Sequence, residues 1–131
     1  MATVSAEAKP NVLIVDDDVV LCEMLAAHLK SEYRVQCAHT CSEALTRMNA
    51  RQADVVILDY DLPDGPGLSV VHKLRSCNPH LRVMLISGDP VRATGDPNFQ
   101  SAAAKAALAK PFTGERLRHA VENLLAAAAQ N

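Results

Sequence analysis

The sequence predicts a doubly wound α/β fold, in which five parallel strands form one sheet with helices on both faces. Two observations lead to this fold class. Short apolar runs of strand length alternate five times with segments whose apolar residues recur at helical spacing. The 131 residues also suffice for one domain and hardly more. Strands that alternate with helices in this way are expected to pair in parallel through right-handed crossovers.

Five segments are expected to be strands. The first, third and fourth are continuous apolar runs, which is typical of strands buried on both faces of a parallel sheet. The second is more polar and the fifth is short, so both are weaker signals. In chain order the expected strands are 12–15, 33–38, 54–58, 82–87 and 107–109.

Four longer segments are expected to be helices, because their apolar residues share one face at helical spacing. Ser42 and Thr113 are the expected N-caps of the second and the last helix. In the first helix, the apolar stripe is expected to consist of Val20, Leu21, Met24, Leu25, His28 and Leu29. The four helices are expected over 19–30, 43–50, 67–76 and from Thr113 toward the end of the chain.

The segment after the fourth strand is harder to interpret. It contains two Gly-Asp-Pro triplets, at 88–90 and 95–97. Proline lacks a backbone donor and restricts the residue before it, so we expect no helix across 88–97. A short helix is expected to begin near Asn98 and to run through Ala104.

The composition excludes several classes of protein. Hydrophobic residues make up 49% and charged residues 21%, which is not the composition of a disordered chain. The formal net charge of -2 argues against nucleic-acid binding through this domain, since such proteins usually have a basic face. No apolar stretch approaches the length of a membrane span. We therefore expect neither nucleic acid nor membrane as a partner.

The two ends of the chain set the expected domain bounds. Residues 1–10 lack the pattern of a secretory signal and are expected to form a flexible tail of a cytoplasmic protein. The domain is expected over 11–128, without an output domain after it. Four cysteines are then expected to be reduced thiols that serve as small apolar residues: Cys22, Cys37, Cys41 and Cys77. A metal clip in CAHTC, residues 37–41, is less favoured, because structural zinc needs four ligands.

Polar side chains follow four of the expected strands at the point where each strand ends. Asp16 and Asp17 follow the first strand, Asp59 the third, Ser87 the fourth and Lys110 the fifth. Because the carboxyl ends of parallel strands meet at one edge of the sheet, these side chains are expected to converge on one crevice.

The converging residues predict a particular chemistry. Two carboxylates 4 Å apart repel by about 4 kcal/mol at an effective dielectric of 20, so three of them favour a bound cation. Mg²⁺, or Mn²⁺, suits an all-oxygen site of this kind. Asp59 is then a candidate nucleophile that forms an acyl-phosphate, and Lys110 and Ser87 are candidates to contact the phosphoryl group.

Four motifs together resemble the receiver domain of two-component response regulators: VDDD (15–18), LDYDLPDGPG (58–67), ISGD (86–89) and KPF (110–112). The resemblance spans about residues 11–128. It implies a flavodoxin-like fold with strand order 2-1-3-4-5. It also implies that Asp59 accepts a phosphoryl group, with Mg²⁺, from a histidine kinase or a phosphotransfer protein, and that the chain then binds a downstream protein, with a homodimer as one possibility.

The resemblance also assigns individual roles. The metal ligands would be Asp16, Asp17, Asp59 and the backbone carbonyl of Asp61. Ser87 would be the switch hydroxyl and Lys110 the active-site lysine, aimed by a cis bond before Pro111. Gly67 would build the turn after the third strand. Asp61 and Asp89, each two residues after a site residue, would tune hydrolysis of the acyl-phosphate, with a sign that the sequence leaves open.

The sequence departs from the receiver pattern at Ala107, where receivers often carry an aromatic ring that moves with the switch hydroxyl. We therefore expect signalling through the loop at 88–101. Two alternatives remain. One is an interaction module that works without phosphorylation. The other is a phosphatase of the haloacid-dehalogenase type, which also uses an aspartyl-phosphate but places its first acid motif on the first strand.

Overall fold

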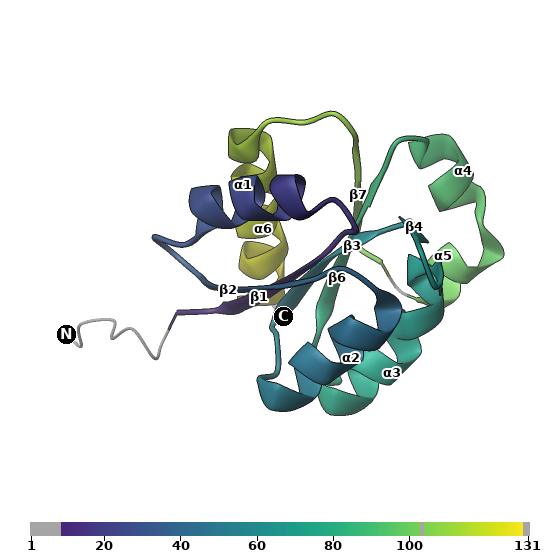
Figure 1. Cartoon of the computed structure of the whole chain (residues 1–131), viewed down its shortest axis with the longest axis horizontal. Coiled ribbons are helices and arrows are strands. Elements are labelled where there is room, and N and C mark those ends of the chain that lie inside the picture. Colours follow the sequence, from purple (N-terminus) through teal and green to yellow (C-terminus); the bar gives the residue numbers. More distant parts are fainter. Residues whose placement is uncertain (1–8, 103, 130–131) are drawn as a thin grey trace.

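The central feature of the protein is a five-stranded parallel sheet, seen in the computed structural model, which describes residues 9–102 and 104–129 (Figure 1). Its strands are β1 (Asn11–Val15), β2 (Arg34–Ala38), β3 (Val55–Asp59), β6 (Arg82–Ser87) and β7 (Ala106–Ala109). They lie in the order β2-β1-β3-β6-β7, and every pair is parallel. This is the order 2-1-3-4-5 expected for a flavodoxin-like fold, so the predicted fold class is confirmed.

Burial along the strands follows their position in the sheet. β3 is buried throughout, and β1 and β6 are buried except at their first residues. The edge strand β2 is mostly half-buried, and β7 has one buried residue. Continuous apolar runs therefore form the centre of the sheet, because both of its faces are covered.

Helices cover both faces of the sheet (Figure 1). On one face, α1 (Val19–Leu29) and α6 (Gly114–Ala129) pack over a core that includes Ile14, Ile57 and Leu117. On the other face lie α2 (Cys41–Ala50), the 3-10 helix η2 (Gly67–Val70) and α3 (Val71–Cys77). The short helices α4 (Pro90–Gly95) and α5 (Pro97–Ser101) follow β6. Within the described ranges, none of the helices combines the length and apolarity needed to cross a bilayer.

The predicted apolar stripe of α1 was partly wrong. Its buried residues are Cys22, Leu25 and Leu29, whereas Val20 is 66% exposed and Met24 55% exposed. Asp18 caps the helix by accepting a hydrogen bond from the Leu21 N–H. The helix thus turns the Cys22 side toward the sheet, so the predicted stripe straddles the boundary between core and solvent.

Two details of the other helices also differ from expectation. Thr40, not Ser42, caps α2, because Thr40 Oγ1 accepts a hydrogen bond from the Glu43 N–H at 3.0 Å. The Glu43 carboxylate in turn accepts one from the His39 N–H at 2.6 Å. The expected cap at Thr113 is confirmed, since its hydroxyl oxygen accepts a hydrogen bond from the Arg116 N–H.

The prediction of no helix across 88–97 was wrong. Each Gly-Asp-Pro triplet begins a helix: Asp89 caps α4 and Asp96 caps α5, and the proline after each acid takes the first helical positions. Proline is well placed there, because the first turn of a helix has no intrahelical partner for its N–H groups. In place of the short helix expected from Asn98 through Ala104, the structure has α5, which ends at Ser101. Residue 103 and most of the expected tail at 1–10 lie outside the described residues.

Candidate functional site

Three carboxylates converge at the carboxyl edge of the central strands. Asp16 and Asp17 follow β1, and Asp59 is the last residue of β3. One carboxylate oxygen from each lies within 4.8 Å of those of the other two. Asp16 is fully buried, Asp59 is 6% exposed, and Asp17 is open to solvent. The structure therefore brings together the acids that the sequence placed at two separate strand ends.

Lys110 reaches this cluster from the end of β7. Its ammonium nitrogen lies 2.7 Å from Asp16 Oδ2, and it donates a hydrogen bond to Asp59 Oδ2 at 3.2 Å. The peptide bond between Lys110 and Pro111 is cis. The backbone N–H of Lys110 donates to the Ser87 carbonyl at 2.8 Å, which fixes the residue beside β6.

Burial and like charge together make the cluster electrostatically unfavourable. Burial raises the pKa of Asp59 above its ordinary value, and the charge of Asp16 raises it further, although Lys110 and the Asp61 N–H act in the opposite direction. Burial alone lowers the pKa of Lys110, but contact with Asp16 and the charge of Asp59 outweigh it, so the net shift is upward. Lys110 therefore stays an ammonium, and one cation faces three carboxylates.

The donor set of the cluster fits a hard divalent cation. Asp16 Oδ1 accepts a hydrogen bond from the Asp18 N–H at 2.9 Å. Asp16 Oδ2 is buried and is in ion-pair distance of Lys110, but outside hydrogen-bond geometry, so it accepts no hydrogen bond from the described residues. A buried carboxylate oxygen left in this state favours a cation, and Mg²⁺ prefers oxygen ligands of this type.

The loop after β3 is held against the acid cluster by a close backbone approach. A side-chain carbon at Gly67 would collide with the carbonyl oxygen of Asp59, so only glycine fits there. The Gly67 N–H donates to the Tyr60 carbonyl at 2.8 Å. In the chain between Tyr60 and Gly67, β4 (Asp61–Leu62) and β5 (Gly65–Pro66) form a two-residue antiparallel ladder, which was not predicted from the sequence. This ladder and Gly67 fix the direction in which Asp59 projects.

Ser87 and the two predicted tuning acids lie on the other side of the pocket. Ser87 is 2% exposed, and its hydroxyl oxygen accepts a hydrogen bond from the Asp89 N–H at 2.9 Å. The Asp89 side chain caps α4 by accepting from the Arg92 N–H. The Asp61 N–H donates to Asp59 Oδ1 at 3.2 Å, while the Asp61 carboxylate points to Arg92. Both tuning acids are thus linked to the start of α4.

Two residues that sequence reasoning missed connect α4 to the site. Arg92 donates to both oxygens of Asp61, at 3.2 and 3.3 Å, and its guanidinium lies 4.9 Å from the centre of the Tyr60 ring. The Tyr60 hydroxyl donates to Asp96 Oδ2 at 2.5 Å. We call Tyr60, Asp61, Arg92 and Asp96 the α4 anchor. The available signal was Tyr60, one of only two tyrosines, placed directly after Asp59.

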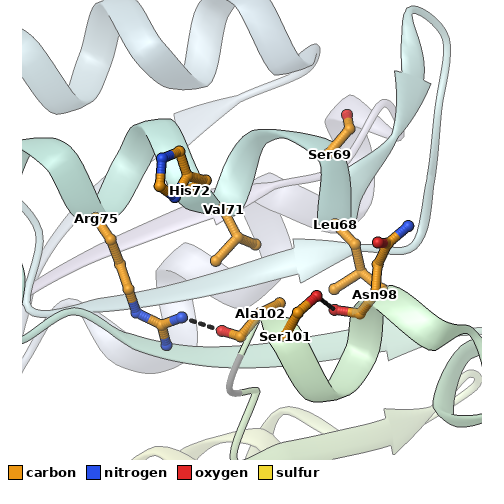
Figure 2. A pocket seen from close by; sticks show the side chains of 8 residues that line it. All are labelled: Leu68, Ser69, Val71, His72, Arg75, Asn98, Ser101 and Ala102. Atoms are coloured by element: carbon orange, nitrogen blue, oxygen red, sulfur yellow. Dashed lines mark hydrogen bonds between the residues drawn. The ribbon is translucent and has the colours of Figure 1, made fainter.

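A separate cavity lies between α3 and α5 and does not include any of the acidic residues (Figure 2). Its volume is about 350 Å³. Val71 and Leu68 line it from the α3 side, and Arg75 donates a hydrogen bond across it to the Ala102 carbonyl. This contact fastens the end of α5 to α3.

Comparison with known proteins identifies the family. The family model described as response regulator receiver domain matches residues 12–122. The chain belongs to this family. Among solved structures, a CheY-like receiver domain protein from Methanospirillum hungatei superposes with a TM-score of 0.84 at 23% identity, covering 93% of this chain and 98% of that one. That likeness confirms the fold of this receiver.

Two curated relatives add to the family match. A probable transcriptional regulatory protein, TcrX of Mycobacterium tuberculosis, is 44% identical over 84 residues, which cover 63% of this chain and 36% of the relative. The transcriptional regulatory protein PmrA of Pectobacterium parmentieri is 36% identical over 119 residues, covering 88% of this chain and 52% of the relative. The receiver thus spans about a third to a half of these two proteins. The family match gives no support to the dehalogenase-type alternative.

Proposed function

We propose that this receiver accepts a phosphoryl group on Asp59 from the phosphohistidine of a histidine kinase or phosphotransfer protein, and signals through phosphorylation-dependent protein binding. One observation carries the proposal: the Asp59 carboxylate shares a pocket with the carboxylates of Asp16 and Asp17 and with the Lys110 ammonium, and the oxygens of this pocket suit a divalent cation. Phosphoryl transfer requires this combination of a nucleophile and charge stabilisation.

In the proposed reaction, a carboxylate oxygen of Asp59 attacks phosphorus while the bond from phosphorus to the donor's imidazole nitrogen breaks. The Asp61 N–H and Lys110 hold the two oxygens of Asp59 in hydrogen bonds and so fix the direction of the carboxylate. Asp16, Asp17 and Asp59, with the predicted backbone carbonyl of Asp61, would hold Mg²⁺ (or Mn²⁺), which supplies neutralisation of the phosphoryl charge.

Lys110 and Ser87 would contact the phosphoryl group after transfer. Lys110 already lies within ion-pair distance of Asp16 and Asp59, so its ammonium can shift to a phosphoryl oxygen with a short movement. The Ser87 hydroxyl accepts from the Asp89 N–H and remains able to donate its own proton. A hydrogen bond from Ser87 to the phosphoryl group would therefore act on the start of α4.

The receiver family is a signalling family, and we propose that this chain catalyses only its own phosphorylation and dephosphorylation. The expected location is the cytoplasm, where the phosphodonor would be found, and the expected target is a downstream protein, with self-association as one possible output. The domain bounds 11–128 stay a prediction.

A module that works without phosphorylation is the second candidate, and one observation favours it. Ala107 on β7 is half-buried and packs against the core of the α2–α3 face, so this position has no ring to couple the site to the surface. This candidate predicts that Asp59→Ala leaves partner binding unchanged.

The direct test is intact-mass analysis of the chain after treatment with acetyl phosphate. We expect one added phosphoryl group with Mg²⁺, none in EDTA, and none in Asp59→Asn. Lys110→Ala should slow labelling by about 100-fold, the usual loss when a donor to the transition state is removed. Asp64→Asn is the matched control and should label like the natural chain, because the Asp64 carboxylate lies outside the acid cluster and accepts from the Cys41 and Ser42 N–H groups at the start of α2. Full labelling of Asp59→Asn, or labelling independent of Mg²⁺, would overturn the proposal.

A further inference from the structure

Two cysteines from separate elements meet at the open edge of the sheet. Cys37 is on β2, the edge strand, and Cys22 is on α1, which packs over it. The Cys37 thiol donates to the Cys22 carbonyl at 3.7 Å, and the Cys22 thiol donates to the Asp16 carbonyl at 3.3 Å. Cys22 is buried, whereas Cys37 is half-buried, so Cys37 is the more accessible residue of the two.

A cavity of about 500 Å³ opens over Cys37. It runs across the edge of β2 from α1 to α2, and both cysteines line it. Its charged residues are Glu23 from α1 and Arg47 and Arg51 from α2, with His39 beside them. Two guanidinium groups against one carboxylate give the cavity an excess of positive charge near the sulfur. This arrangement favours an anionic ligand.

The surroundings of Cys37 stabilise its thiolate. Interaction with the Cys22 side chain lowers the pKa of Cys37 most, burial acts against it, and the charges of His39 and Arg47 lower it further, to about 7. Glu23 opposes these effects only weakly. The Cys22 sulfur is buried, so it is less accessible to a reagent than the sulfur of Cys37. The nucleophile of the pair is therefore the accessible one.

The remaining thiols have different environments. Burial raises the pKa of Cys41, and the nearby Asp64 carboxylate raises it further. The Cys77 thiol donates a hydrogen bond to Asn49 Oδ1 at 3.2 Å. The reactivity of Cys37 can therefore be compared with that of three other thiols in the same chain, those of Cys22, Cys41 and Cys77.

We propose that Cys37 is a modification site at which low-molecular-weight anionic disulfides react to form a mixed disulfide. The Cys37 thiolate attacks one sulfur of the disulfide, a new sulfur–sulfur bond forms, and the other half leaves as a thiolate that carries the electron pair. Cys37 is oxidised and the departing half is reduced, so the disulfide itself is the oxidant. Arg47 and Arg51 attract the negative groups of the reagent. The proposal is independent of phosphorylation at Asp59.

The test uses the full chain under native conditions at pH 7 and a dianionic probe, 5,5′-dithiobis(2-nitrobenzoate). Samples are quenched with acid at intervals, and peptide mass mapping locates the adduct. We expect the adduct on Cys37 to form about 10-fold faster than on Cys41 or Cys77, because the thiolate fraction sets the rate of exchange. Equal or faster reaction of Cys41 or Cys77, or reaction only after unfolding, would overturn the proposal.

Charge selectivity is tested with a second probe and a pair of variants. Replacing both Arg47 and Arg51 with Gln should slow the anionic probe at Cys37 by about threefold at low salt and leave neutral 4,4′-dithiodipyridine unchanged. Arg116→Gln on α6 is the matched control and should change neither rate. Cys22→Ser keeps a hydrogen-bond donor beside Cys37 and cannot close an internal disulfide, so its adduct should stay on Cys37. An equal effect on both probes would contradict recognition by charge.

Discussion

The two sides of the acidic pocket around Asp59 are built in opposite ways. On one side, Asp16 and Asp59 are fixed by the buried central strands β1 and β3, and their charges are crowded despite the cost. On the other side, α4 and α5 are helices of six and five residues, held to the loop after β3 by the α4 anchor. The Arg92 and Asp61 side chains of that anchor are 57% and 65% exposed.

This difference separates a rigid part of the site from a movable one. Backbone pairing decides where Asp16 and Asp59 lie, so their charges stay crowded in a position that the strands do not allow them to leave. Around α4 the opposite holds, because charge pairs and hydrogen bonds decide where the helix lies. Exposed contacts of this kind open at low free energy, so α4 is the part of the receiver best suited to move when the pocket changes.

The same substitution in both regions should produce the largest contrast. Gly67→Ala is expected to lower the free energy of unfolding by about 2 kcal/mol, because the new carbon collides with the Asp59 carbonyl and the strand cannot retreat. Gly95→Ala in α4 meets no atom within 4 Å. It should raise the free energy of unfolding by roughly 0.5 kcal/mol, because alanine leaves the unfolded chain fewer conformations than glycine does. Urea denaturation followed by circular dichroism measures both, and equal effects would contradict the contrast.

Replacing one acid in each region should change the free energy of unfolding by a smaller amount, upward for Asp59 and downward for Asp96. The pKa of Asp59 is raised, so its contribution to stability is fully present below the ordinary Asp pKa and is lost as pH rises through the folded value. Asp59→Asn, in EDTA at pH 7, should therefore raise the unfolding free energy by on the order of 1 kcal/mol, the part of the charge repulsion that Lys110 leaves.

Asp96 is the matched acid on the other side. The hydrogen bond from Tyr60 lowers its pKa, so its contribution is present above the ordinary Asp pKa and is lost as pH falls through the folded value. Asp96→Asn should destabilise the chain at pH 7. Denaturation curves at several pH values should show both differences shrinking as pH falls, that of Asp59→Asn as its carboxyl becomes protonated and that of Asp96→Asn as pH passes through its lowered pKa. A destabilised Asp59→Asn at pH 7 would contradict the crowding of charge.

Sequence reasoning succeeded where backbone periodicity decides the structure. The apolar runs of β1 and β3 lead directly to Asp16 and Asp59, so knowing that parallel strands share one edge was enough to place these two acids together. Lys110 followed from the same argument through β7. The end of an apolar run is a local property of the sequence, so a single sequence is enough to predict where each of these strands ends.

It failed at one local signal, the Asp-Pro helix starts, and wherever contacts between distant side chains decide. The prolines at 90 and 97 were interpreted as helix breakers, although the acids before them make them helix starts. The α4 anchor joins residues more than 30 positions apart, and no local pattern in the sequence records such a pair. The exposed side of α1 was missed for the same reason, since packing against the sheet sets the rotation of that helix.

The smallest and most local effect is expected from loosening the α4 anchor. Combining Arg92→Gln with Tyr60→Phe removes the contacts to Asp61 and Asp96, which tie α4 and α5 to the loop after β3. Amide hydrogen exchange over 90–101 should become several-fold faster, with β3 and β6 unchanged, because local opening no longer breaks these contacts. Arg116→Gln is the control and should leave the segment as it was.

The same variant decides whether the anchor transmits the signal. In the natural chain, beryllofluoride, a mimic of the acyl-phosphate, should change exchange over 88–101, because Ser87 and Asp61 lie between Asp59 and α4. In the double variant, beryllofluoride should still protect the pocket amide of Asp61 but leave 90–101 unchanged. An equal response of 90–101 in both chains would show that α4 senses Asp59 through Ser87 alone, and that Tyr60 and Arg92 only hold the helix in place.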